Sequence, residues 1–156
     1  MIKFANKTKG FTVVELLVSL AIMAVLAVVV FSTFINFRKN EALVMDAETI
    51  VSVLRQARNQ TLTSKNSSSY GVHIIASKIT IFSGTSYVSG NSGNQDFVLS
   101  NTDTILTISL TGGGSDVVFQ RLTGETSQNG TVTVSSPGLN QTKTVTIYKT
   151  GLVDSN

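Results

Sequence analysis

The residues of this chain that could do chemistry do not form a catalytic set. Asp96, Asp103 and Asp116 could serve as metal ligands or as a general acid and base, but they lie in separate Gly- and Asn-rich segments without a recurring spacing. Because aspartates in such segments bond to nearby backbone groups, we expect these three to be solvated turn residues. His73 is the only histidine and is expected to be a strand residue, and the glycines at 112–114 lack the Lys-Ser/Thr pair of a phosphate-binding loop. The sequence therefore predicts no catalytic residue, no metal site and no cofactor.

Glu15 is an acid placed at the start of a strongly apolar segment. It follows the junction Lys9-Gly10-Phe11, and the residues after it are almost all aliphatic. Placing a carboxylate inside a bilayer costs about 2–3 kcal/mol or more, so acids in such segments usually face a partner. The alternative is that Glu15 sits at the headgroup boundary, where its charge reaches water.

The apolar segment is long enough to cross a membrane. Three hydroxyl side chains are the only polar ones between residues 16 and 35, and a helix of this length spans a hydrocarbon core of roughly 30 Å. The segment is too long for the apolar part of a secretory signal, and no small-residue cleavage site follows it. Lysines 3, 7 and 9 precede it, which predicts an N-terminus on the cytoplasmic side. A buried core helix is the alternative, but it would need a larger surrounding domain than this chain supplies.

The composition excludes several classes of function. The chain has 156 residues and no cysteine, so a disulfide scaffold, a Cys-ligated zinc site and a thiol nucleophile are excluded. Its pI of 9.3 comes from the N-terminal residues. Three of the 12 basic residues lie in the first nine positions, and the other nine equal the nine acidic residues in number. Because binding to phosphates depends on clustered Lys and Arg, nucleic acid is not expected as a partner.

The helix is expected to continue beyond the membrane segment to residue 62. Neither Gly nor Pro occurs between residues 11 and 62, and after residue 38 small and apolar side chains recur at steps of three and four. This stripe consists of Leu43, Ala47, Ile50, Leu54, Ala57 and Thr61. It needs a covering partner, which the rest of the chain can supply. Arg55 and Arg58 lie on the same part of the helix and are expected to keep its surface soluble, with an acid of a neighbouring subunit as the alternative partner.

From residue 63 the sequence changes to short β-type runs separated by Gly, Asn and Ser. The expected strands are residues 70–76, 78–82, 97–99, 105–110, 117–122, 131–134 and 144–148, with loops at 83–95 and 112–115. Valine alternates with threonine in the run 131–134, which predicts an antiparallel sheet with one buried face, and Tyr70, Phe82 and Phe119 are expected in the core. The predicted fold class is α+β: a long N-terminal helix, with a membrane half and an amphipathic half, packed on a β-rich antiparallel head.

The junction around Gly10 resembles the class III signal of type IV prepilins and type II secretion pseudopilins. In that family a short basic leader ends in Gly, Phe opens the mature chain and Glu is its fifth residue; here these are Gly10, Phe11 and Glu15. The resemblance implies that prepilin peptidase cleaves between Gly10 and Phe11 and that Phe11 becomes N-methylated. It also implies a cleaved leader at 1–10, a transmembrane and assembly helix at 11–37, the amphipathic half of that helix at 38–62 and a pilin-like head at 63–156.

The same resemblance implies partners and a location. Glu15 would neutralise the charged N-terminus of a neighbouring subunit, and the partners would be other pilin or pseudopilin subunits and the inner-membrane assembly platform. The protein would be a single-pass inner-membrane protein with a cytoplasmic N-terminus and an external head, and would then enter an extracellular or periplasmic filament. The head most resembles the H-type pseudopilins and related minor pilins, through residues 53–58, the expected strand pair at 70–82, and residues 116–124 and 144–151. The sequence departs from the pattern of many pilins in having no cysteine. It also has Ser32 at the position where many major pilins have proline.

Three functions are compatible with these features. The first is a minor structural subunit of a type IV pilus or a type II secretion pseudopilus. The second is a tip-located pilin that binds DNA or an exported protein, although residues 150–154 lack the arginines that DNA-binding minor pilins carry there. The third is a signal-anchored surface protein that never polymerises. Gly10 and Glu15 favour the first two functions, because a simple anchor needs neither residue.

Overall fold

The computed structural model describes residues 10–63 and 65–156, so most of the leader expected at 1–10 lies outside the described residues. Helix α1 (Val13–Leu62) runs without interruption through both predicted halves. No glycine or proline interrupts this stretch, so each residue after the first turn can donate its N–H to a carbonyl one turn earlier. The prediction of one continuous helix is confirmed.

The chain divides into two compact units, one ending at Phe37 and the other comprising Arg38–Asn156. In the described part of the first unit, the large apolar side chains from Phe11 to Phe37 are all exposed, because nothing packs against them. The second unit contains the rest of α1 and all the strands in the described residues.

The strands of the second unit form two four-stranded sheets, in which every pairing is antiparallel. The first sheet has the order β3-β2-β1-β5, with β1 (Tyr70–Ile75), β2 (Lys78–Ser83), β3 (Gln95–Val98) and β5 (Asp116–Val118). The second has the order β4-β6-β7-β8, with β4 (Thr104–Leu110), β6 (Gly130–Ser136), β7 (Gln141–Ile147) and β8 (Val153–Ser155). A short 3-10 turn, η1 (Lys65–Ser67), connects α1 to β1.

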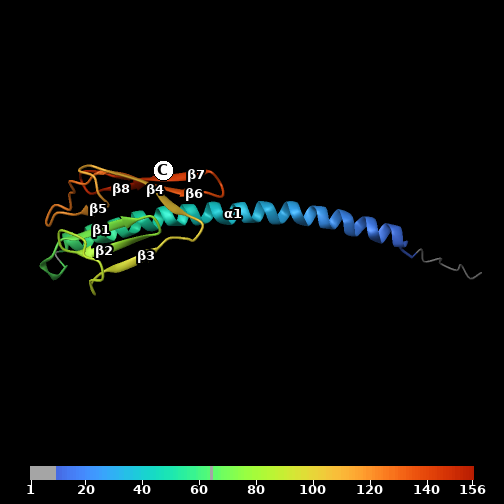
Figure 1. The fold of residues 1–156 in the computed structure, drawn as a ribbon, viewed down its shortest axis with the longest axis horizontal. Coiled ribbons are helices and arrows are strands. Elements are labelled where there is room, and N and C mark those ends of the chain that lie inside the picture. Colours follow the sequence, from blue (N-terminus) through green and yellow to red (C-terminus); the bar gives the residue numbers. More distant parts are fainter. Residues whose placement is uncertain (1–9, 64) are drawn as a thin grey trace, which may run out of the picture. The chain divides into compact units, whose positions relative to one another are not determined.

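The core of this unit forms where α1 meets both sheets. Strands β1, β2 and β3 lie on one side of the helix, and strands of the second sheet lie on the other (Figure 1). All six residues of the predicted helical stripe are buried. Five of them, all except Thr61, join apolar side chains of both sheets in one cluster. Tyr70, Phe82 and Phe119 are buried as predicted. The α+β prediction of a helix packed on an antiparallel head is confirmed.

The strand prediction was wrong in two places. The expected strand at 117–122 ends at Val118, because the chain turns at Leu122, whose φ of 74° is incompatible with a strand. Strand β8 was not expected, since Val153–Ser155 is too short to show a periodic pattern. The strands form two sheets, and α1 presents buried side chains to both.

Candidate processing and assembly site

The segment from Gly10 to Thr12 is exposed and precedes the first turn of α1. Gly10 and Phe11 are both exposed, Phe11 at 85 %, and neither belongs to a helix or strand. A peptidase needs an accessible, non-helical stretch around the bond that it cleaves, and the Gly10–Phe11 bond meets that requirement. Since α1 begins at Val13, cleavage there would remove no residue of the helix.

Thr12 caps the N-terminus of α1, a feature that the sequence reasoning missed. Its hydroxyl oxygen accepts a hydrogen bond from the N–H of Glu15 at 3.2 Å, and its carbonyl accepts one from the N–H of Leu16 at 3.1 Å. Thr12 is therefore the N-cap residue and Glu15 the third helical residue, which is the Thr-x-x-Glu spacing of a capping box. The spacing is visible in the sequence, so this signal could have been found. A carboxylate in the first turn also interacts favourably with the helix dipole.

The surface of α1 after Glu15 suits a lipid environment. Its most apolar 18-residue window has a mean hydropathy of 2.9, and none of that window is buried against the protein. The hydroxyls of Ser19 and Thr33 donate to carbonyls of their own helix, at 2.9 Å to Leu16 and 3.0 Å to Val29. Polar groups in a bilayer must be satisfied internally, and these two are. The segment therefore fits a single-pass membrane anchor.

The three aspartates that were expected in solvated turns lie elsewhere, and that prediction was wrong. Asp96 belongs to β3 and forms an ion pair with Lys78 at 2.7 Å. Asp116 belongs to β5 and lies opposite His73 on β1, where Asp116 Oδ1 is 2.6 Å from His73 Nδ1. Asp103 follows a turn but is buried. Because the three occupy different environments, they do not assemble into a metal or acid–base site.

His73 is a strand residue, as predicted, with an additional aromatic contact. Its ring stacks on Tyr87 with a centroid distance of 3.9 Å and an interplanar angle of 0°. Tyr87 also meets Phe82 edge to face, at 5.8 Å. These contacts hold the loop between β2 and β3 on the first sheet, which is a structural role.

Arg55 and Arg58 bind backbone carbonyls of the C-terminal segment instead of only facing solvent. Arg55 donates to the carbonyl of Val153 at 2.9 Å, and Arg58 donates to that of Thr150 at 3.4 Å. Arg58 also donates to the carbonyl of Gly124, in the loop between β5 and β6, at 3.1 Å. The Val153 carbonyl belongs to β8, the outer strand of the second sheet, so Arg55 occupies a group that another strand could otherwise pair with. The two arginines therefore fasten the end of the chain to α1.

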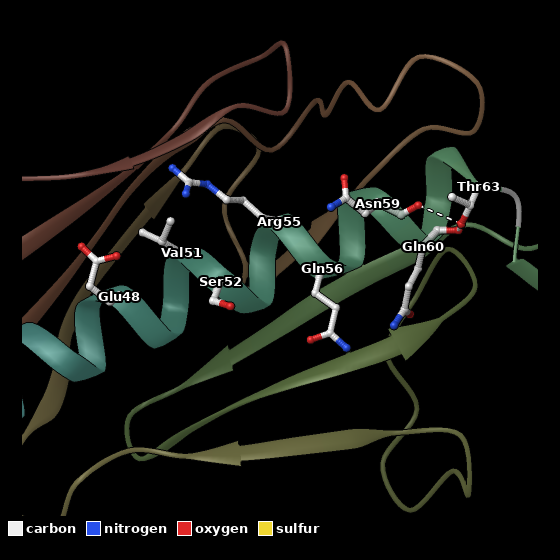
Figure 2. Close-up of a pocket in the computed structure, with 8 residues that line it drawn as sticks. All are labelled: Glu48, Val51, Ser52, Arg55, Gln56, Asn59, Gln60 and Thr63. Atoms are coloured by element: carbon white, nitrogen blue, oxygen red, sulfur yellow. Dashed lines mark hydrogen bonds between the residues drawn. The ribbon is translucent and has the colours of Figure 1, made fainter.

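The exposed face of α1 forms an open groove of about 460 Å³ (Figure 2). It is lined by Glu48, Val51, Ser52, Arg55, Gln56, Asn59, Gln60 and Thr63. Gln56 and Gln60 point toward the first sheet, while Arg55 points the other way (Figure 2). The charged groups of the groove already have partners, since Glu48 accepts a hydrogen bond from the hydroxyl of Ser155. The groove contains no nucleophile paired with a base.

The fold and the exposed apolar start of α1 define a pilin-like α+β architecture. A family model described as the prokaryotic N-terminal methylation motif matches residues 5–31. The matched residues include Gly10, Phe11, Glu15 and most of the apolar segment, so the motif supports the similarity to pilins. A search of curated proteins and a search of solved structures found no match to this chain. Motif and fold together suggest a structural protein that is processed like a prepilin.

Proposed function

We propose that this chain is a minor structural subunit of a type IV pilus or a type II secretion pseudopilus. Prepilin peptidase cleaves it between Gly10 and Phe11, Phe11 is N-methylated, and the subunit then assembles through α1 with other subunits on an inner-membrane platform. The observation that carries the proposal is the methylation motif at 5–31, whose described part runs from the exposed residues Gly10 and Phe11 into the unburied apolar start of α1.

The position of the cleavage supports this proposal on physical grounds. Cleavage after Gly10 leaves Thr12 in place, so the capped end of α1 remains intact. It also creates an ammonium group on Phe11, next to the positive end of the helix dipole, where a cation is unfavourable. A carboxylate near this ammonium relieves that cost. Glu15 lies in the first turn and has the opposite charge, so Glu15 of one subunit can neutralise the N-terminus of a neighbour.

The cleavage is tested by mass spectrometry of the N-terminal peptide from native membranes. We expect a peptide that begins at methylated Phe11. A mature chain that still carries residues 1–10 would show that the chain is not processed as a prepilin.

The role of Glu15 is tested by comparing three variants in membranes and in sheared filaments. Glu15→Leu removes the charge and the carboxyl at the third helical position, and we expect a stable, cleaved, membrane-inserted protein that is lost from filaments. Glu15→Gln keeps the hydrogen-bonding capacity of the third helical position but not the charge, so its incorporation should lie between wild type and Glu15→Leu.

Thr12→Ala is the matched control, because it removes the cap bond and keeps the charge. Loss of this cap costs about 1 kcal/mol of helix stability and should leave incorporation near the wild-type level. Wild-type incorporation of Glu15→Leu would refute the charge pairing and favour the signal-anchored alternative. Failure of Thr12→Ala together with normal incorporation of Glu15→Gln would show that Glu15 acts only in the cap.

A further inference from the structure

A buried pair of carboxyl groups lies where α1 meets the connection between β3 and β4. Asp46 of α1 is only 8 % exposed, and Asp103 of the connection is 7 % exposed. Asp46 Oδ2 accepts a hydrogen bond from the N–H of Ser100 at 2.9 Å. The N–H of Asp103 donates to the carbonyl of Ser100 at 3.1 Å, so the backbone of Ser100 holds the two carboxyl groups close together, where they can hydrogen-bond when one of them is protonated. Two carboxylates in contact repel each other strongly, and one ionises far less readily than the other.

The same place contains buried oxygens that lack a hydrogen-bond partner in the described part of the chain. They are both carboxyl oxygens of Asp103 and the hydroxyl oxygen of Ser136, which is 1 % exposed. The register of β4 and β6 places Asp103 opposite Ser136, one step beyond the last paired residues. Side chains alternate along a strand, so both lie on the face that Ile105 and Val134 turn toward the core. Buried oxygens without donors are costly, and a proton on the pair supplies a donor.

No basic side chain neutralises this pair among the residues that the structure describes. The ion pairs in that part of the chain are made by Lys78 and His73 in the first sheet. On α1, Lys39 reaches the turn between β6 and β7, and Glu48 accepts a hydrogen bond from a hydroxyl of β8. Lys143 on β7 forms no ion pair with any residue that the structure describes. Protonation is therefore the way in which the described side chains can relieve the repulsion.

Burial raises the pKa of Asp46 from its ordinary value of 3.8 to about 6, and the charge of Asp103 adds to this rise while the Ser100 N–H opposes it. A carboxyl whose pKa is higher in the folded state binds its proton more tightly when folded. The folded state is therefore favoured most below pH 3.8, and this advantage is lost as the pH rises to about 6.

We propose that Asp46, Asp103 and Ser136 form a proton-operated latch, in which a shared proton holds the β3–β4 connection on α1 at acidic pH and its release to solvent at neutral pH loosens the connection. This connection joins the two sheets of the head, because β3 is in the first sheet and β4 in the second. The latch thus sets how firmly the sheets are joined over the helix. It does not depend on cleavage or on filament assembly.

The test is thermal unfolding of the full chain in detergent micelles, measured between about pH 4.5 and pH 8. We expect the melting temperature of the wild type to fall as the pH rises. In Asp103→Asn the amide donates to the Asp46 carboxylate without a charge, so its melting temperature near pH 7.5 should exceed that of the wild type and depend less on pH. Glu41→Gln removes an exposed carboxylate of α1 and should keep the wild-type pH dependence.

Amide hydrogen exchange at Ser100 gives a local measure of the latch. After correction for intrinsic exchange, we expect opening to be on the order of tenfold more frequent near pH 7.5 than near pH 5, and this difference should vanish in Asp103→Asn. A wild-type melting temperature independent of pH, or ordinary carboxyl titration of both Asp46 and Asp103 by carbon-13 NMR, would overturn the proposal, and the NMR result needs no variant that folds. Stabilisation of the wild type by millimolar calcium near pH 7.5, absent in Asp103→Asn, would instead identify a cation site.

Discussion

Gly151→Ala tests how the C-terminal segment is fastened to α1. Gly151 has a φ of 75°, and a β-carbon there would overlap the carbonyl oxygen of Gly124 and lie 2.8 Å from Arg58 Nε. The turn after β7 and the loop at Gly124 must therefore separate to admit the methyl group. That separation breaks the bond from Arg58 to the Gly124 carbonyl, which is 3.1 Å long in the wild type.

The expected cost has two parts. A residue with a β-carbon pays about 1–2 kcal/mol to adopt a left-handed conformation. A hydrogen bond from a charged donor contributes about 1.5–3 kcal/mol. Gly151→Ala should therefore lower the free energy of unfolding by about 2.5–5 kcal/mol, which corresponds to a fall in melting temperature of roughly 10–20 °C for a unit of this size.

Gly113→Ala is a matched control, because Gly113 has nearly the same φ, 74°, and a β-carbon there would meet no atom within 4 Å. It should cost only the conformational part, about 1–2 kcal/mol. The assay is differential scanning calorimetry of the full chain in detergent, together with amide exchange at Thr126, whose N–H bonds to the carbonyl of Lys149 at 3.0 Å. Equal melting temperatures for the two variants, with Thr126 equally protected, would refute the close packing inferred around Gly151.

Two further predictions concern the core and the first sheet. Leu54 is completely buried, so Leu54→Ala should lower the free energy of unfolding by about 2–5 kcal/mol in denaturant titrations, while Met45→Ala at an exposed position of the same helix should have little effect. Lys78 lowers the pKa of Asp96 below 3.8, so Lys78→Met should return it toward that value in carbon-13 NMR titrations. Asp96 stabilises the fold above its ordinary pKa and loses this effect as the pH falls, which is opposite in sign to Asp46.

The sequence alone was enough to predict the features whose signals lie in neighbouring residues. An uninterrupted helix followed from the absence of glycine and proline and from the stripe that includes Ile50 and Leu54. The Gly10–Phe11 junction with Glu15 was recognisable because a processing signal is read from contiguous residues before any fold exists. The capping pair Thr12 and Glu15 belongs to this group as well, since an N-cap and its third helical residue are always neighbours in the chain.

The tertiary structure alone decided which distant residues meet. Strand β8 exists because Arg55 and the edge of β7 hold three residues that carry no periodic pattern of their own. Asp103 was predicted to be a solvated turn residue and no local pattern marked Asp46, and only the packing of α1 against the β3–β4 connection buries the two together. A local sequence pattern reflects the conformational preferences of neighbouring residues. The contacts of β8 and of Asp46 with Asp103 depend instead on how chain segments far apart in the sequence pack around a shared core.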